Sequence, residues 1–211
     1  SDVYKRQTKY GIDPAKVVTV HNAVDFSGRS DIKVERGVKD KVVTFLGRIT
    51  FQKGPEYFIE AAAKVLKRCD NVRFVMAGSG DMMNRSIRQV ARLGISDRFH
   101  FTGFLRGSEV QKMFALSDVY VMPSVSEPFG ISPLEAMRTG VPSVISRQSG
   151  AAEVLKYAFK VDFWDADQIY ALLKYPALSE FASKYGYDEV NTLKWNNAAA
   201  KIKNVYESVI K

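Results

Sequence analysis

The sequence predicts an α/β fold built on a doubly wound parallel sheet with helices on both faces. Two observations predict it: short apolar runs of β-type residues alternate with helical stretches through the middle of the chain, and the C-terminal part is helical. Strands that alternate with helices at this spacing form a parallel sheet. Right-handed crossovers bring the carboxyl end of every strand to one edge, where ligands of such sheets bind. We therefore expect functional residues in the loops that follow the strands.

Each element has a local signal. Runs rich in Val, Ile, Phe and Met predict five strands, at residues 41–46, 72–77, 98–102, 118–122 and 142–145. Helical spacing predicts helices between them at 55–67, 81–93, 108–116 and 132–138, and after them at 165–173, 178–185 and 196–210. Pro55 stands at a first helical position, where its missing N–H costs nothing, and Asp81 is a suitable helix cap.

The two ends of the chain differ from the middle. Residues 1–37 hold one strand-like run, at 16–20, and then lose periodicity, so we interpret them as a linker or the tail of an upstream domain. Residues 38–190 form the predicted sheet domain, and 191–211 a C-terminal helix. No secretory signal opens the chain, and no apolar run reaches the roughly 18 residues of a membrane span. A single cysteine, Cys69, fits a reducing compartment, so we expect a cytoplasmic protein.

The net charge of +8 narrows the class of partner. Nucleic acid, an anionic membrane surface and a phosphorylated small molecule would each suit a basic protein. The basic residues are spread along the chain, without zinc-finger spacing or an RNA-binding aromatic signature, so we expect no nucleic-acid partner. A solvated basic surface without a specific partner, a phosphate site and weak adhesion to a membrane surface all remain open.

The loop after the first strand, residues 47–55, reads GRITFQKGP. Gly47 is followed by two cations, Arg48 and Lys53, on a short path into a helix. A guanidinium fork, an ammonium group and backbone N–H groups together make an anion site. The alternative is two solvated surface cations beside a turn.

The next two loops carry weaker signals. Gly78 and Gly80 allow close approach of a ligand, but they suit a plain strand-to-helix turn equally well. After the third strand, the main chain at Phe104 and Leu105 could touch a flat ring, but the sequence does not require it.

The loop after the fourth strand is the most informative, and residues 127–135 read EPFGISPLE. Ser132 as N-cap, Pro133 at the first helical position and Glu135 three residues after the cap predict a capping box. Glu135 thus has an ordinary structural explanation, whereas Glu127, in a loop with the flexible Gly130, has none. An anion site beside two acidic acceptors suits a ligand that is part phosphate and part polyol.

These residues resemble a known family. Glu127 and Glu135 enclose seven residues, like the Glu-x7-Glu motif of retaining glycosyltransferases of the GT-B fold, in the group often called family 4. Glycogen and starch synthases are similar. The family's other motifs are matched by GR at 47–48 with KG at 53–54, AGSG at 77–80, FTGF at 101–104, SDVYVMPS at 117–124, and NAVD at 22–25 with alanine in place of glycine. The resemblance covers about residues 10–211 and implies the Rossmann-like C-terminal domain of a GT-B enzyme.

The resemblance implies a nucleotide-sugar donor and a role for each matching position. Arg48 and Lys53 would bind the donor diphosphate and stabilise its charge as it leaves, while Glu127 would hold the sugar hydroxyls; these three are the expected catalytic residues. Glu135 would accept hydrogen bonds from the ribose. The expected donor-binding residues are Gly47, Gly78, Phe104, Leu105, Phe129, Gly130, Ile131 and Glu135. No cofactor and no metal ion are implied.

The resemblance also implies a missing part. GT-B enzymes have two domains, and the N-terminal one, which binds the carbohydrate or lipid-linked acceptor, is not matched. We expect the final helix to return toward that domain and the isolated chain to turn over little substrate. Two alternatives stay open: another GT-B enzyme, such as a nucleotide-sugar epimerase or a pyridoxal-phosphate-dependent phosphorylase, and a noncatalytic nucleotide- or anion-binding module. His21, in the linker, is a candidate to line the cleft.

Overall fold

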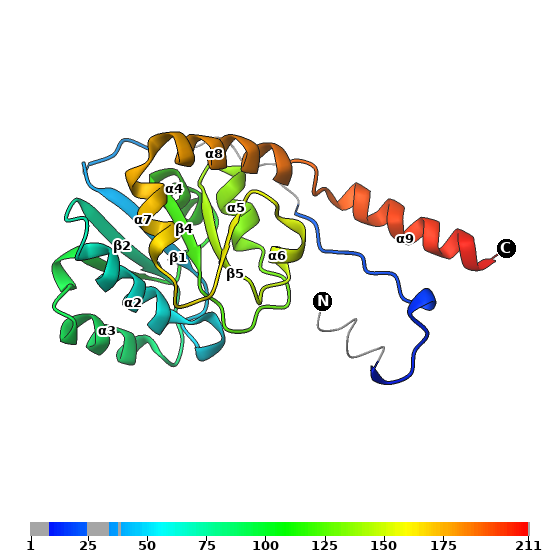
Figure 1. Ribbon diagram of the computed structural model, residues 1–211, viewed down its shortest axis with the longest axis horizontal. Helices are drawn as coiled ribbons and strands as arrows, with labels where there is room; N and C mark the ends of the chain where they lie inside the picture. The colour runs from blue at the N-terminus through cyan, green and yellow to red at the C-terminus, as the bar shows by residue number, and fades with distance from the viewer. Residues whose placement is uncertain (1–8, 25–33, 38, 211) are drawn as a thin grey trace.

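The computed structural model describes residues 9–24, 34–37 and 39–210. They form a six-stranded sheet in the order β3-β2-β1-β4-β5-β6, with every pair parallel (Figure 1). The order reverses between β1 and β4, which is the position where doubly wound sheets bind ligands. The predicted fold class is therefore confirmed.

The strands are β1 (Lys41–Leu46), β2 (Val72–Ala77), β3 (Phe99–Gly103), β4 (Val119–Met122), β5 (Ser143–Ser146) and β6 (Phe159–Val161). The α-helices are α2 (Pro55–Leu66), α3 (Met83–Arg92), α4 (Ser108–Leu116), α5 (Ser132–Arg138), α6 (Ala151–Val154), α7 (Asp167–Lys174), α8 (Pro176–Val190) and α9 (Trp195–Ile210). Three short 3₁₀ turns complete the described elements: η1 (Pro14–Lys16), η2 (Phe51–Lys53) and η3 (Ser96–Arg98).

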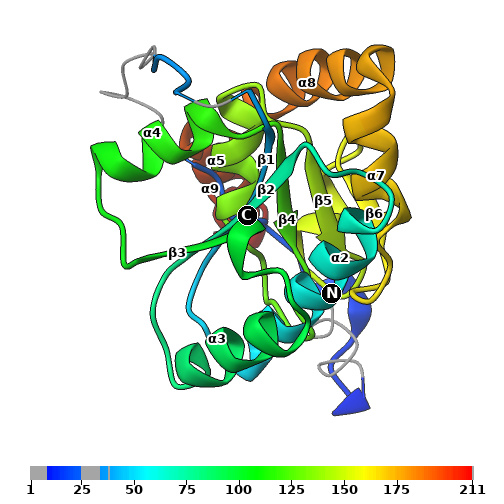
Figure 2. The ribbon, with the colours of Figure 1, turned by 90° about the vertical axis from the view of Figure 1, so that its left-hand side faces the viewer.

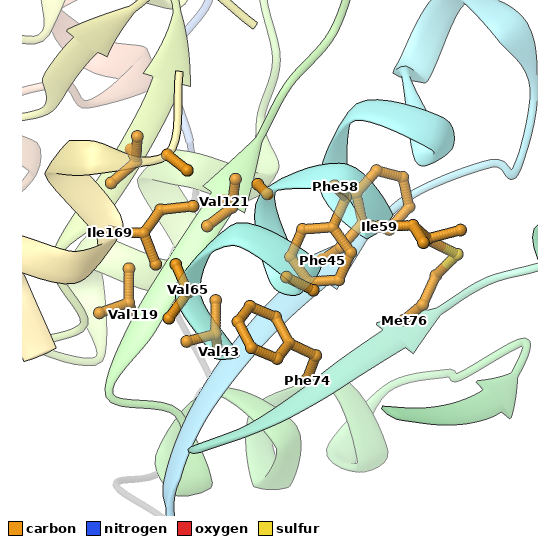
Figure 3. Close-up of a cluster of buried hydrophobic side chains, with 14 of the residues drawn as sticks. Val43, Phe45, Phe58, Ile59, Val65, Phe74, Met76, Val119, Val121 and Ile169 are labelled. Atoms are coloured by element: carbon orange, nitrogen blue, oxygen red, sulfur yellow. The ribbon is translucent and has the colours of Figure 1, made fainter. Parts of the chain in front are cut away.

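Two apolar clusters cover the two faces of the sheet, because side chains alternate along each strand. On one face Phe45 and Phe74 pack with Phe58 of α2, whose ring centroid lies 5.6 and 5.7 Å from theirs (Figure 3). On the other face Tyr120 packs against Phe114 of α4 at 5.6 Å. Burial on both faces explains why the strands read as continuous apolar runs.

The helices divide between the faces in the same way. Helices α2, α3 and α7 cover the first cluster, and α4, α5 and α6 cover the second. Figure 2 shows the sheet between α5 on one side and α2 on the other. Helix α8 spans both clusters, with Ala182 in the first and Val190 in the second. Its C-terminal half therefore reaches the face on which α5 lies.

Three sequence predictions about the elements need correction. The run at 16–20 is not a strand: η1 ends at Lys16, and Val17 to Val20 pair with no strand among the described residues. Asp81 does not cap α3, which begins after Met82 and has no side-chain cap bond. The prediction also missed α6 and β6, which have four and three residues and are too short to show a periodicity.

The two ends of the described chain leave the domain side by side (Figure 1). The N–H group of Val24 donates to the carbonyl oxygen of Leu193, 3.2 Å away, just before α9 begins. Helix α9 extends from the body and buries only Ala198. Its exposed apolar side chains are Trp195, Ile202, Tyr206, Val209 and Ile210. None of the helices in the described ranges is long and apolar enough to cross a membrane.

Candidate functional site

The loop after β1 is fixed by close contact with the loop after β2. The N–H group of Ile49 donates to the carbonyl oxygen of Ser79 at 2.9 Å, and the N–H group of Met82 donates to that of Ile49 at 3.0 Å. Gly78, with φ +142°, and Gly80 face the carbonyl oxygens of Gly47 and Ile49 so closely that neither has room for a Cβ atom. The two glycines therefore allow the loop at residues 47–54, called here the phosphate-type loop, to pack directly against the loop after β2.

The same loop is joined to the loop after β4. Gly54, at φ +66°, packs against the carbonyl oxygen of Pro123. The carbonyl oxygen of Gln52 accepts hydrogen bonds from the N–H groups of Val125 and Ser126 at 3.0 and 3.3 Å. Lys53, the last residue of η2, thus stands at the junction of two loops that are far apart in sequence.

The loop that carries Glu127 is also fixed from its other side. The carbonyl oxygen of Glu127 accepts from the N–H group of Gly150 at 3.0 Å, and that of Phe129 accepts from the N–H group of Ala151 at 2.7 Å. These donors belong to the start of α6, the helix that the sequence did not predict. The Glu127 backbone is therefore set by η2 on one side and by α6 on the other.

Lys53 Nζ and Glu127 Oε2 form an ion pair between these two loops. Only 23% of the lysine side chain and 9% of the glutamate side chain are exposed. Solvent screens a pair this buried far less than it screens a surface pair. Two of the three predicted catalytic residues, 74 positions apart, are thus in direct contact.

The predicted residues surround two neighbouring pockets at the carboxyl edge of the sheet. The larger, of about 790 Å³, is lined among others by Gly47, Arg48, Gly78, Phe104, Leu105 and Glu135. The smaller, of about 330 Å³, is lined among others by Lys53, Glu127, Phe129, Gly130 and Ile131. Leu46, the last residue of β1, lines both. The structure therefore brings every predicted site residue to one edge and divides them between two compartments.

The predicted capping box is wrong. Ser132 is the first helical residue of α5, the N-cap position falls on Ile131, and Ile131 makes no side-chain cap hydrogen bond. Ile131 has helical φ and ψ values (−81° and −34°), so the helix begins one residue earlier than the predicted capping box requires. Glu135 lies in the first turn of α5 and lines the larger pocket.

Tyr120 lies beneath the two loops and is fully buried. Burial raises the pKa of its phenol far above the ordinary value, the hydrogen bond with Ser132 lowers it, and the charges of Glu135 and Glu127 raise it further. The phenol therefore stays protonated. Its hydroxyl lies 3.4 Å from the carbonyl oxygen of Leu46, which it reaches as a donor. Tyr120 thus links the end of β1 to the start of α5.

Several lining residues were missed by sequence reasoning. In the larger pocket, the guanidinium group of Arg138 lies over the ring of Tyr187 of α8, with its Cζ atom 4.9 Å from the ring centroid. In the smaller pocket, Asn22 comes from the segment before β1, and Ser124 is fully buried. The further residues of α8 along the larger pocket are Ser183, Lys184 and Asp188. No local pattern marks them, because only the path of α8 across the domain brings them there.

His21 lies close to the smaller pocket but is not among its lining residues. Its Nε2 atom is 3.4 Å from Glu153 Oε2, and its ring centroid is 6.5 Å from that of Phe129. Its neighbour Asn22 takes the lining position instead. Asp25, the last residue of the predicted NAVD linker motif, lies outside the described residues. Across the described ranges, no three His, Cys, Asp or Glu residues are grouped as metal ligands would be.

Comparison with known proteins identifies the family. The family model described as glycosyl transferases group 1 matches residues 28–174. An uncharacterized glycosyltransferase of Methanocaldococcus jannaschii is 37% identical over 188 residues, which span 81% of this chain and 46% of that protein. The chain thus spans less than half the length of that relative.

Solved structures show the same fold. The C-terminal domain of a glycosyl transferase group 1 family protein from Francisella tularensis superposes with a TM-score of 0.66 at 26% identity, over 72% of this chain and 85% of that domain. The HepE protein of Anabaena, solved in complex with UDP-glucose, superposes with a TM-score of 0.71 at 21% identity, over 81% of this chain and 49% of that one. The expected fold, the C-terminal Rossmann-like domain of a GT-B glycosyltransferase, is confirmed. The chain belongs to the glycosyl transferases group 1 family.

Proposed function

We propose that this domain binds a nucleotide-diphosphate sugar and that, joined to an N-terminal domain, it transfers the sugar to an acceptor with retention of the anomeric configuration. The observation that carries the proposal is the contact between Lys53 and Glu127. It joins a cationic loop suited to a diphosphate and an acidic loop suited to sugar hydroxyls, at the switch point of a parallel sheet.

The two compartments match the two halves of such a donor. The nucleotide lies in the larger pocket, with its base against the main chain at Phe104 and Leu105 and its ribose hydroxyls on Glu135. The diphosphate bridges Arg48 and Lys53, and the sugar enters the smaller pocket beside Glu127. HepE, in its complex with UDP-glucose, supports a nucleotide sugar as the ligand class.

The chemistry that follows is a displacement on one face of the sugar. The bond from C1 of the sugar to the β-phosphate oxygen breaks, the bond from C1 to the acceptor oxygen forms on the same face, and the acceptor proton passes to the departing phosphate. Arg48 and Lys53 stabilise the negative charge that grows on the diphosphate. Glu127 orients the sugar through its hydroxyls. These two cations supply the charge stabilisation, so the proposal includes no cofactor and no metal ion.

The acceptor requires a second domain. Val24 and Leu193, which are hydrogen-bonded to each other, are where the N-terminal segment and α9 leave the body together. We infer that residues 1–37 form the linker from the acceptor-binding domain, that 38–190 form the donor domain, and that 191–211 return to the acceptor domain through the exposed apolar side of α9. The acceptor is a carbohydrate or a lipid-linked molecule. The setting we propose is cytoplasmic, with peripheral contact to a membrane surface.

Isothermal titration calorimetry with UDP, ADP, GDP and their glucose conjugates tests the donor site on this chain. At least one of these ligands should bind, and the Arg48→Ala and Lys53→Ala variants should each weaken it by about tenfold or more. Lys64→Ala removes the same charge from the distal end of α2 and should leave the affinity unchanged. Equal affinity in the wild type and all three variants would overturn the site assignment. Single-stranded nucleic acid that binds better than every nucleotide would favour an anion-binding module.

Rapid sugar transfer by the isolated chain would contradict the proposed need for a second domain. Conversion of the donor into its sugar epimer, without transfer, would identify an epimerase. The two outcomes are separated by chromatographic analysis of the sugar product.

A further inference from the structure

The Lys53–Glu127 ion pair joins the two groups that the proposed function assigns to different parts of the donor. Lys53 serves the diphosphate and Glu127 the sugar, yet without ligand each is occupied by the other. The backbone of Glu127 is fixed by Gly150, and the loop of Lys53 by Val125 and Ser126. The two loops therefore hold Lys53 and Glu127 close together, unlike an ion pair between two long, mobile side chains on the surface.

Separating this pair has different consequences for different ligands. A nucleoside diphosphate offers Lys53 an anionic partner but offers Glu127 nothing. The carboxylate, only 9% exposed, would lose its cation and gain a repulsive phosphate close by. Leaving one member of a buried pair without a partner is costly. An intact nucleotide sugar offers a phosphate to Lys53 and hydroxyl donors to Glu127, so both groups exchange one partner for another.

A second group in the same pocket points to a hydroxylated ligand. Ser124 is fully buried and lines the smaller pocket, and its Oγ atom has no hydrogen-bond partner among the described residues. A buried hydroxyl without a partner is unfavourable, and buried polar groups in proteins are nearly always satisfied. A sugar hydroxyl entering beside Glu127 would satisfy it, whereas a free diphosphate would leave this pocket empty.

We propose that the Lys53–Glu127 ion pair makes this site select an intact nucleotide sugar over the free nucleoside diphosphate that the reaction leaves behind. This inference rests on the proposed function. Glu127 is then a specificity-determining residue as well as a sugar ligand, because its charge lowers the affinity for the spent product. The product dissociates readily, and the next donor is favoured.

The test is a calorimetric comparison of UDP, ADP and GDP with UDP-glucose, ADP-glucose and GDP-glucose on the whole 211-residue chain. The wild type should bind the sugar conjugate of its preferred nucleotide more tightly than the free diphosphate. In Glu127→Gln, affinity for the free diphosphate should rise by about three- to tenfold, because Lys53 is released. Affinity for the sugar conjugate should fall or stay level, so the preference between the two ligands is lost.

Glu56→Gln is the matched control. Glu56 lies in the first turn of α2, close in sequence to Lys53, but it pairs with Arg85 at 3.3 Å and lines neither pocket. Like Glu127→Gln, the Glu56→Gln substitution removes one negative charge close to the phosphate-type loop. If the pair itself is responsible, Glu56→Gln changes the affinity for the free diphosphate by less than about twofold. In a Lys53→Met background, Glu127→Gln should no longer strengthen binding of the diphosphate.

The outcomes separate this inference from the proposed function. If the wild type binds one of the six ligands but Glu127→Gln binds the free diphosphate no more tightly, the selection mechanism is wrong and the donor site stands. The same conclusion follows if Glu56→Gln strengthens diphosphate binding equally. If the folded wild type binds none of the six ligands, both the proposed donor site and the selection mechanism are wrong. Thermal unfolding of each variant shows whether it is folded.

Discussion

The hydroxyl of Tyr120 lies 3.4 Å from the carbonyl oxygen of Leu46, the last residue before the phosphate-type loop. The same hydroxyl bonds with Ser132 at the start of α5. One buried phenol thus connects the segment before the loop of Arg48 with the segment after the loop of Glu127.

Tyr120→Phe should therefore affect binding more than folding. The ring still fills its place in the core, but the two segments lose their shared hydrogen-bond partner. We expect the affinity for a nucleotide sugar to weaken by about two- to fivefold, in line with the loss of one hydrogen bond. Calorimetry measures the affinity, and thermal unfolding should show a shift of only a few degrees. An unchanged affinity would show that Tyr120 is only a core residue.

The raised pKa of Tyr120 predicts a specific alkaline behaviour. The phenol stays protonated in the folded protein, whereas in the unfolded chain it ionises at about pH 10. Its contribution to stability is therefore fully present below that pH and is lost as the pH rises above it. Denaturant unfolding at a series of pH values from 8 upward should show a steeper decline for the wild type than for Tyr120→Phe. Parallel curves would contradict the assignment.

Gly78→Ala should distort the phosphate-type loop. A Cβ atom at Gly78 meets the carbonyl oxygen of Gly47, and the φ angle of +142° is itself unfavourable for alanine. We expect a loss of stability of about 1–3 kcal/mol and a loss of measurable nucleotide binding. Gly94→Ala is the matched control, because Gly94 also has a positive φ, +68°, but has open space around it. It should lose stability by backbone strain and keep its nucleotide affinity.

Asp118→Asn should weaken the sheet without touching the site. The carboxylate of Asp118 accepts from the N–H group of Val42 at 2.8 Å and pairs with Arg36 at 2.7 Å and Lys41 at 3.1 Å. Burial acts to raise its pKa, but the hydrogen bonds with Arg36, Val42 and Lys41 outweigh it and leave the pKa lowered. Its stabilising effect is thus present at neutral pH and is lost as the pH falls through that lowered pKa.

The expected loss for Asp118→Asn at pH 7 is about 1–3 kcal/mol, measured by denaturant unfolding. At pH 2 the difference between the wild type and the variant should become small. A constant difference at both pH values would mean that the charge of Asp118 is not what stabilises the junction of β1 and β4.

Removal of α9 should leave the domain stable. The helix buries only Ala198 among its own residues and exposes the side chains of Ile202, Tyr206 and Val209. We expect a chain ending at Lys194 to unfold at a temperature within a few degrees of the full chain in differential scanning calorimetry. A large drop would show that α9 belongs to this domain and not to the interface with the acceptor domain.

Sequence periodicity was sufficient to predict the position of the long, buried helices and strands. Strand β1, strand β2, helix α4 and helix α5 have the predicted bounds, because each carries a clear apolar pattern. It failed where the elements are short, as in α6 and β6, or where an apolar run has no neighbouring strand, as at Val17 to Val20.

The site was predictable in its residues but not in its contacts. Arg48, Lys53, Glu127 and Glu135 all reach the expected edge of the sheet. That Lys53 meets Glu127 depends on two loops held by backbone hydrogen bonds, and the linear sequence does not show them. The predicted capping box was wrong because Ile131 already has helical φ and ψ values, so Ser132 lies inside the helix. The Arg138 contact with Tyr187 likewise depends on the course of α8.

The most direct test of the account is an amide NMR titration of the isotopically labelled chain with the nucleotide sugar that binds best. If the donor lies across the Lys53–Glu127 pair, the largest shift changes fall in residues 47–54, 103–105 and 123–135. The same titration with the free nucleoside diphosphate should perturb the first two of these segments and leave residues 127–131 less affected. Changes concentrated elsewhere, for example on the exposed arginines of α3, would contradict the account.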